Sequence, residues 1–224
     1  MLVTNCNCSD LFQRERLTVQ LHSRSLVEKN SLGRELLTNP RWPLIGDFQM
    51  GWVVFLRAVN VGRTNLCRPA LLAKQLSRFG VVNIGAAGTF AVRENVSEST
   101  LRNAIAKKLP FKCEIMICSA RDIIELASTD PFAKQPFGPD ITRFVNVLAK
   151  RLPSPPALPI YLPSENDWLL KVIAIQNKFV VGLYRRQMKA ISYLGKIEKL
   201  LGVPATNRNW NTIQKVAKIL EPDR

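Results

Sequence analysis

An unbroken apolar run, Trp52 to Leu56, is the feature that most constrains how this chain folds. The run is too short for a helix and shows no alternation of polar and apolar residues, so it predicts a strand buried on both faces. A polar segment follows directly, and it begins with Arg57. We therefore expect a central strand over 52–58 whose following loop is exposed and held by a rigid scaffold.

The pattern after this run alternates between strand and helix signals. Pro69 and Ser97 stand where helices commonly begin, and Gly80 stands where one commonly ends. The predicted elements are strands at 52–58, 81–86, 89–93 and 113–118 and helices at 68–79 and 97–109. Their order is that of the ferredoxin-like split βαβ unit, βαββαβ. We predict such a subdomain for residues 50–130.

The second half of the chain predicts a smaller α+β subdomain at residues 131–224, after a helix at 119–128. Proline recurs between 153 and 163, which indicates a stiff extended connector. The predicted elements are a strand at 141–149, a hairpin of 168–175 and 178–185 that turns at Gln176-Asn177, and helices at 189–201 and 209–220. The fold class predicted for the whole chain is α+β.

Residues 1–49 differ from the rest of the chain. They show no steady apolar period, and they end in the proline-rich stretch 39–46. We interpret them as an N-terminal extension without a fixed structure. Met50 stands just before the first strand, so we hypothesise that translation starts there.

Charge and residue types exclude several functions. The net charge is +15, and residues 50–224 supply +14 of it with 26 Lys or Arg against 12 Asp or Glu. A basic protein can attract nucleic acid or phosphates, although a dispersed basic surface without a specific partner is the simpler interpretation. The only histidine is His22, so the folded part cannot build histidine-based catalysis or a histidine-rich metal site.

The five cysteines are odd in number and have no CxxC spacing, so the sequence predicts neither a disulfide framework nor a metal site. We also predict no cofactor. No apolar run approaches the length of a membrane span, and the N-terminus does not resemble a secretory signal. We therefore expect a cytoplasmic protein without a membrane partner. Its oligomeric state is left open.

Two segments carry polar groups suited to an anion. The loop 60–65 follows the central strand, and the segment 206–212 precedes the last helix, where free backbone N–H groups attract anions. The alternative is that these side chains only satisfy loop backbone and cap helices, with Trp210 as a buried anchor. If the two segments converge on one anion site, Arg57→Ala and Arg208→Ala weaken binding with little loss of stability. The candidate anion-binding residues are Arg57, Asn60, Gly62, Arg63, Arg208, Asn209 and Asn211.

Two stretches resemble one known family. Phe55-Leu-Arg-Ala-Val-Asn-Val-Gly62 is similar to the opening signature of the domain of unknown function 1697 family, and Leu200 to Thr212 is similar to its closing signature. The resemblance spans about 51–220 and leaves residues 1–49 uncovered. It implies a bacterial α+β protein with a ferredoxin-like first part and no established activity.

These observations leave three functions open. The first is a binding protein for an anionic ligand, either a nucleotide or a nucleic acid. The second is an enzyme that acts on a small phosphorylated substrate, with Arg57 and Arg208 on the phosphate and Asp122 or Asp140 as base. The third is a structural or protein-interaction module. The sequence alone does not decide whether the protein is an enzyme.

Overall fold

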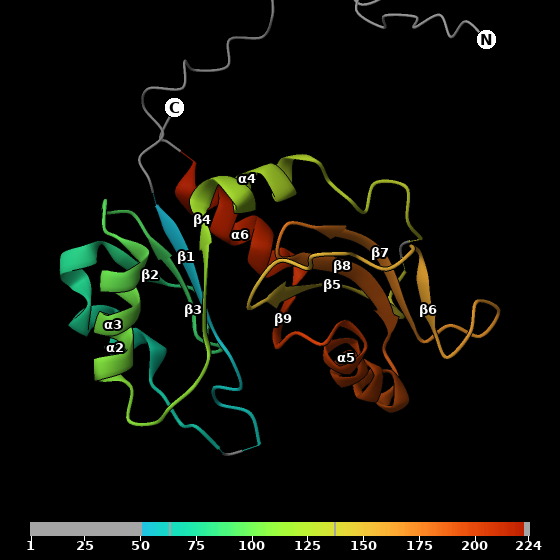
Figure 1. Ribbon diagram of the computed structural model, residues 1–224, viewed down its shortest axis with the longest axis horizontal. Coiled ribbons are helices and arrows are strands. Elements are labelled where there is room, and N and C mark those ends of the chain that lie inside the picture. The colour runs from blue at the N-terminus through green and yellow to red at the C-terminus, as the bar shows by residue number, and fades with distance from the viewer. Residues whose placement is uncertain (1–50, 63, 137, 222–224) are drawn as a thin grey trace, which may run out of the picture. The chain divides into compact units, whose positions relative to one another are not determined.

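Two antiparallel sheets form the framework of the protein, and the α+β class is confirmed (Figure 1). The computed structural model describes residues 51–62, 64–136 and 138–221. The predicted extension 1–49 and the candidate residue Arg63 therefore lie outside the described residues. The first sheet consists of β1 (Trp52–Leu56), β2 (Val81–Asn83), β3 (Thr89–Val92) and β4 (Ile115–Ser119), in the spatial order β2-β3-β1-β4.

Strand β1 is central, as the apolar run predicts. It pairs with β3 on one side and with β4 on the other, so both of its edges are covered. Its residues alternate between two cores: Val53 and Phe55 face one cluster, and Val54 and Leu56 face another. Helices α2 (Pro69–Gln75) and α3 (Glu98–Lys108) cover the second of these clusters on the outer side of the sheet (Figure 1).

The second sheet carries helix α5 on one face. Phe144 and Leu148 pack on Tyr193 and Ile197 of that helix. The strands are β5 (Ile141–Leu148), β6 (Ile160–Leu162), β7 (Leu170–Gln176), β8 (Phe179–Arg185) and β9 (Ala205–Asn209), and α5 spans Met188–Leu201. Their spatial order is β6-β7-β8-β5-β9, and all the pairings are antiparallel.

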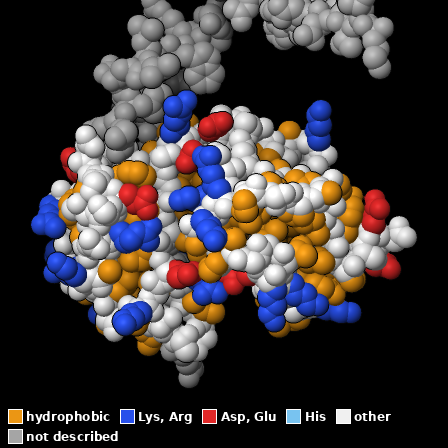
Figure 2. Space-filling view, in the orientation of Figure 1, with side chains coloured by type: hydrophobic (Ala, Val, Ile, Leu, Met, Phe, Trp, Pro, Cys, Tyr) orange, Lys and Arg blue, Asp and Glu red, His pale blue; other side chains and the backbone are white. Residues whose placement is uncertain are grey.

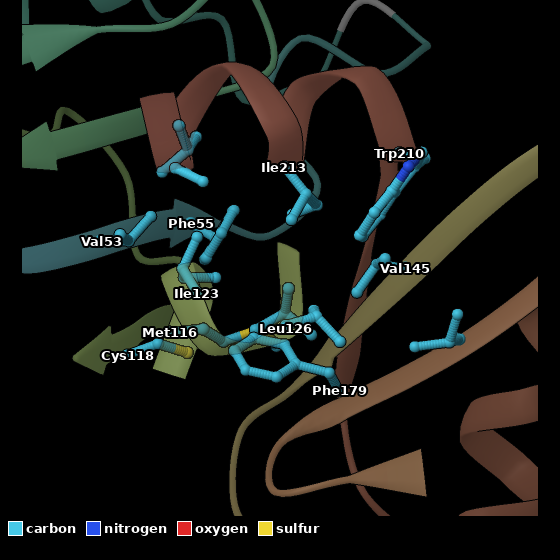
Figure 3. Packing of buried hydrophobic residues seen from close by; sticks show 14 of the residues in the cluster. Val53, Phe55, Met116, Cys118, Ile123, Leu126, Val145, Phe179, Trp210 and Ile213 are labelled. Atoms are coloured by element: carbon cyan, nitrogen blue, oxygen red, sulfur yellow. The ribbon is translucent and has the colours of Figure 1, made fainter. Parts of the chain in front are cut away.

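Helices α4 (Ala120–Ser128) and α6 (Trp210–Leu220) share one apolar core with both sheets. Figure 3 shows Phe55 of β1, Leu126 of α4, Phe179 of β8 and Ile213 of α6 among the side chains of this core. We call this cluster the central core. It joins the end of β1 to β5, the strand that pairs with β9, and it therefore helps to position the site described below.

Three predictions of secondary structure are wrong in detail. The residues of strand β9 were predicted only as the segment that precedes the last helix, because Thr-Asn-Arg-Asn has low strand propensity. Pairing with β5 overrides that propensity. The short strand β6 lies inside the predicted proline connector. The turn of the β7–β8 hairpin is one residue later than predicted, because Gln176 still pairs with Phe179 and Asn177 takes a φ of 54°.

Strand ends also differ from prediction. The first strand stops at Leu56 and not at 58, since Ala58 has a φ of 53°. The second strand stops at Asn83, and the helix predicted at 68–79 divides into α2 and a 3-10 turn at Ser77–Phe79. The predicted caps are confirmed at Ser97 and Ser119, whose hydroxyls accept from Thr100 and Asp122 backbone N–H groups. The division at residue 130 stays a prediction.

Candidate anion-binding cavity

A cavity of about 410 Å³ lies where the end of β1, strand β9 and helix α5 meet. In Figure 2 the outline of the molecule is notched between its two halves on this side. The lining comes from both sheets and from segments far apart in sequence. The lining residues are Leu56, Arg57, Ala58, Val59, Val61, Ala87, Asn146, Leu194, Gly195, Glu198, Ala205, Thr206, Asn207 and Arg208.

Arg208 reaches from β9 across to the first sheet. Its guanidinium has five N–H donors, and each finds an acceptor. Two of these bonds go to hydroxyl groups, and its carbon Cζ lies 5.5 Å from the centre of the Phe55 ring. Nε donates to Thr89 Oγ1 (2.7 Å), Nη1 to Thr206 Oγ1 (2.8 Å) and Asn207 O (2.7 Å), and Nη2 to Leu56 O (2.9 Å) and Ala87 O (2.8 Å).

No carboxylate neutralises this guanidinium. Among the residues that the structure describes, the ion pairs are formed by Arg57, Arg102 and Arg185, and Arg208 forms none. Only 6% of Arg208 is exposed. Burial lowers the pKa of the guanidinium to about 10, so it is still protonated at neutral pH. The cavity wall therefore holds a buried positive charge without an opposite charge.

The turn between β2 and β3 supplies carbonyl groups to Arg208. The two strands are antiparallel, and Gly85 and Gly88 of the turn both take a positive φ. Gly88 takes a φ of 68°, and a Cβ atom there would lie 2.9 Å from Leu56 Cβ. A glycine is therefore required for the turn to lie close enough to β1. The turn also accepts a bond at Ala86 O from the side chain of Asn60 (2.9 Å).

Arg57 pairs with Glu198 of α5 on the other side of the cavity. Its Nη2 and Nε donate to the two carboxylate oxygens at 2.8 and 3.1 Å, and Nε also donates to Ala205 O. This hydrogen bond to Glu198 is the main reason why the pKa of Arg57 is raised. Arg57 and Glu198 neutralise each other, so the net positive charge of the lining side chains resides on Arg208.

Asn146 contributes a side-chain donor to the cavity. It lies on β5 beside Asn207 of β9 and is 2% exposed. Its Oδ1 accepts from Asn207 Nδ2 at 2.8 Å. The hydrogen bonds found among the described residues leave Asn146 Nδ2 without an acceptor. Since Asn146 lines the cavity, this amide N–H can donate to water or to a ligand atom there.

The structure brings together only two of the candidate residues predicted from the sequence. Arg57 and Arg208 line the same cavity. The others lie outside its lining, apart from Arg63, which is not described. The side chain of Asn60 donates to Ala86 O and accepts from the Cys67 N–H, and Gly62 lies in a turn with open space around it. Asn209 caps α6 by accepting from the Asn211 N–H, and Asn211 is exposed.

Asn146, Asn207, Glu198 and Gly195 are among the lining residues that the sequence did not predict. Asn146 left a signal, because it interrupts an apolar strand at a position that should be buried. Asn207 stands inside the segment 200–212, which resembles the closing signature. Glu198 left no signal, because a carboxylate on a charged helix is ordinary. Gly195 also left a signal, because it is a glycine inside a helical pattern.

The carboxylates predicted as catalytic bases lie elsewhere. Asp140 pairs with Arg185 at 2.9 Å, and Asp122 stands in the first turn of α4. Glu198 is the only acidic residue in the lining. In the part of the chain that is described, no three His, Cys, Asp or Glu side chains gather as a metal site. No described helix is long and apolar enough to cross a membrane.

Comparison with known proteins supports the family resemblance. The model of one family, described as "Protein of unknown function (DUF1697)", matches residues 50–160. These residues belong to that family. The DUF1697 match ends before the segment 200–212, whose likeness to the closing signature stays a prediction. The family description assigns no activity.

No curated protein matches the chain. One similar solved structure is "conserved bacterial protein SP0830 from Streptococcus pneumoniae". It is 16% identical, and the similarity covers 77% of this chain and 99% of that chain with a TM-score of 0.49. The site is therefore interpreted from its own geometry.

Proposed function

We propose that this DUF1697 protein binds a small organic anion, of about the size of a nucleotide, in the cavity beside Arg208. The observation that carries the proposal is the buried guanidinium without a carboxylate partner. A charge in a poorly solvated wall acts strongly on a neighbouring charge, because the local dielectric constant is low. An anion in the cavity would supply the missing opposite charge.

The direct hydrogen bonds to the ligand come from other groups. All donors of Arg208 are used by the protein, so Arg208 acts through its charge and by holding the wall together. Asn146 Nδ2 is the free donor, and Arg57 can turn from Glu198 toward a ligand because 38% of its side chain is exposed. The volume of about 410 Å³ lies within the range of small-molecule sites, roughly 300–1,000 Å³.

A small anion is favoured over nucleic acid as the ligand. A nucleic-acid site needs basic residues that follow a backbone over several phosphates. Figure 2 shows Lys and Arg side chains in separate groups on this face, with Asp and Glu among them. An enzymatic role would need a base in the cavity, and the only lining carboxylate, Glu198, is held by Arg57 and the Ala205 N–H.

The ferredoxin-like subdomain and the cytoplasmic location belong to the same proposal. The strand order β2-β3-β1-β4, with a helix before β2 and another before β4, supports a ferredoxin-like reading of residues 50–130. The free thiols of Cys67 and Cys113 are partly exposed, which suits a reducing compartment. In a ferredoxin-like subdomain β1 is the central strand, and the cavity lies at its end.

The test exchanges one amide for a carboxylate. Asn146→Asp keeps the acceptor for Asn207 and the side-chain size, but it replaces the free donor with a negative charge. We expect adenosine monophosphate to bind the unaltered protein in calorimetric titration. Asn146→Asp should bind it at least about 100-fold more weakly. The lost bond between the donor and the charged phosphate contributes about 1.5–3 kcal/mol, and repulsion between the new carboxylate and the phosphate weakens binding further.

Asn211→Asp is the matched control, because it adds the same charge outside the cavity, at the helix start predicted from the sequence. We expect it to change binding by less than about threefold, since exposed charges are screened. The proposal is wrong if Asn211→Asp abolishes binding and Asn146→Asp does not. It is also wrong if an oligonucleotide binds and no mononucleotide or phosphate does.

A further inference from the structure

Gly195 occupies a position in α5 that does not need a glycine. It lies in the middle of the helix, where glycine is about 1 kcal/mol less favourable than alanine. It does not take the left-handed conformation found at the turn glycines, such as Gly88. A Cβ atom at 195 would meet no atom within 4 Å. Neither the backbone nor the packing of the folded protein therefore explains the residue.

The cavity gives Gly195 a function, because the glycine forms part of its wall. A glycine in a helix lets a ligand approach the bare backbone. Much of the remaining wall is apolar, including Leu56 and Val59 on the side of the first sheet and Leu194 next to the glycine. Val61, which also lines the cavity, is 63% exposed. This wall suits an apolar group better than a hydrated inorganic ion.

The apolar surface continues from the cavity along α5. Ile191 and Met188 stand four and seven positions before Gly195, so helical geometry places them on the same side of the helix. Both are exposed, Ile191 to 54% and Met188 to 83%. Exposed large apolar side chains beside a cavity commonly mark a binding surface. The charged end of the cavity and this apolar strip therefore form one amphipathic site.

We propose that the ligand is an amphipathic organic anion whose apolar ring lies against the bare backbone at Gly195, while its anionic group lies toward Asn146 and Arg208. This inference rests on the proposed function, and it adds the chemical class of the ligand and the residue that admits it. The size of the side chain at position 195 then decides which ligands enter the cavity.

The experiment compares two probes with the same anionic group, inorganic phosphate and phenyl phosphate. We expect the unaltered protein to bind phenyl phosphate at least about tenfold more tightly, since burial of apolar surface favours binding and each 1.4 kcal/mol is tenfold. Gly195→Leu extends a side chain into the cavity. We expect it to lower the affinity for phenyl phosphate to that of inorganic phosphate and to change the affinity for inorganic phosphate by less than about twofold.

Gly195→Ala is the test of the glycine itself. Because a Cβ atom meets nothing there, we expect the melting temperature without ligand to rise by about 2–4 °C. A fall in melting temperature would show that the fold requires the glycine, and the inference would then be wrong. The unchanged affinity of Gly195→Leu for inorganic phosphate shows that its weaker binding of phenyl phosphate does not come from unfolding.

Gln214→Leu is the matched control for the leucine variant. Gln214 is exposed on helix α6 and does not line the cavity, so the same side chain there should leave both affinities unchanged. The inference is overturned if Gly195→Leu binds phenyl phosphate as tightly as the unaltered protein does, or if Gln214→Leu weakens it equally. If neither probe binds any of these proteins, the proposed function itself fails.

Discussion

Replacing Arg208 with methionine is expected to lower the free energy of unfolding by about 3–5 kcal/mol, because it leaves several buried acceptors unsatisfied at about 1–3 kcal/mol each. Methionine has a similar length and no donors. The change leaves the buried acceptors Leu56 O, Thr89 Oγ1 and Thr206 Oγ1 without their present donors. Because these acceptors belong to both sheets, the hydrogen bonds that connect β9 to the first sheet are lost as well. Urea unfolding, monitored by circular dichroism, measures the effect.

Arg57→Met is the matched control, because the same substitution is made at a half-buried arginine of the same cavity. We expect it to cost less than about 1 kcal/mol, as is usual for an ion pair at the surface. Arg208→Lys should fall between the two, since an ammonium group keeps the charge but has fewer donors. Equal losses for Arg57→Met and Arg208→Met would contradict the role assigned to Arg208.

Trp210→Ala is expected to cost about 3–5 kcal/mol, the range of large-to-small changes at buried aromatic residues. Trp210 is 1% exposed and contacts the Phe132 ring at a centroid distance of 5.0 Å. Its Nε1 makes no hydrogen bond among the described residues, so the loss is one of packing. Because the central core joins both sheets, we expect the variant to unfold in a single transition at lower denaturant concentration.

Trp168→Ala is the control for this truncation. Trp168 is only half-buried and stacks on the Arg185 guanidinium, with 4.7 Å from Cζ to the ring centroid. We expect a loss of about 1 kcal/mol, within the range of exposed cation–π contacts. Two separate transitions for Trp210→Ala would show that the two sheets unfold independently, and would contradict a shared central core.

The sequence predicted the elements that depend on local pattern. The run at 52–56 indicated a central strand because apolar residues without alternation are buried on both faces. Ser97 and Ser119 indicated helix starts because their hydroxyls cap the first turn. The strand β9 escaped prediction because nothing in Thr206 to Asn209 favours a strand until β5 lies beside it.

The candidate site was predicted only in part, and for a physical reason. Arg208 was chosen as a residue at a helix start, but its partners Leu56, Ala87 and Thr89 are more than a hundred residues away in the sequence. Such contacts exist only after the fold brings the segments together. The expectation that Arg208→Ala costs little stability therefore does not hold for a buried guanidinium with these bonds.

Asn146 and Gly195 show in another way that a sequence does not reveal what only the fold brings together. Each breaks a local rule: a polar residue in an apolar strand, and a glycine in a helix. A sequence shows that the rule is broken but not why, because the reason is the cavity that the two residues share. Such residues, which break a local rule without a visible compensation, commonly belong to functional sites.

The most direct test of the central claim is a titration of the isotope-labelled protein with phenyl phosphate, followed by nuclear magnetic resonance. The account predicts that the largest shifts occur at the Asn146 side-chain amide, the Gly195 backbone amide and the Val61 amide, and that they saturate together with one dissociation constant. Shifts that spread over the exposed lysines without saturating, and leave Asn146 and Gly195 unchanged, would contradict it.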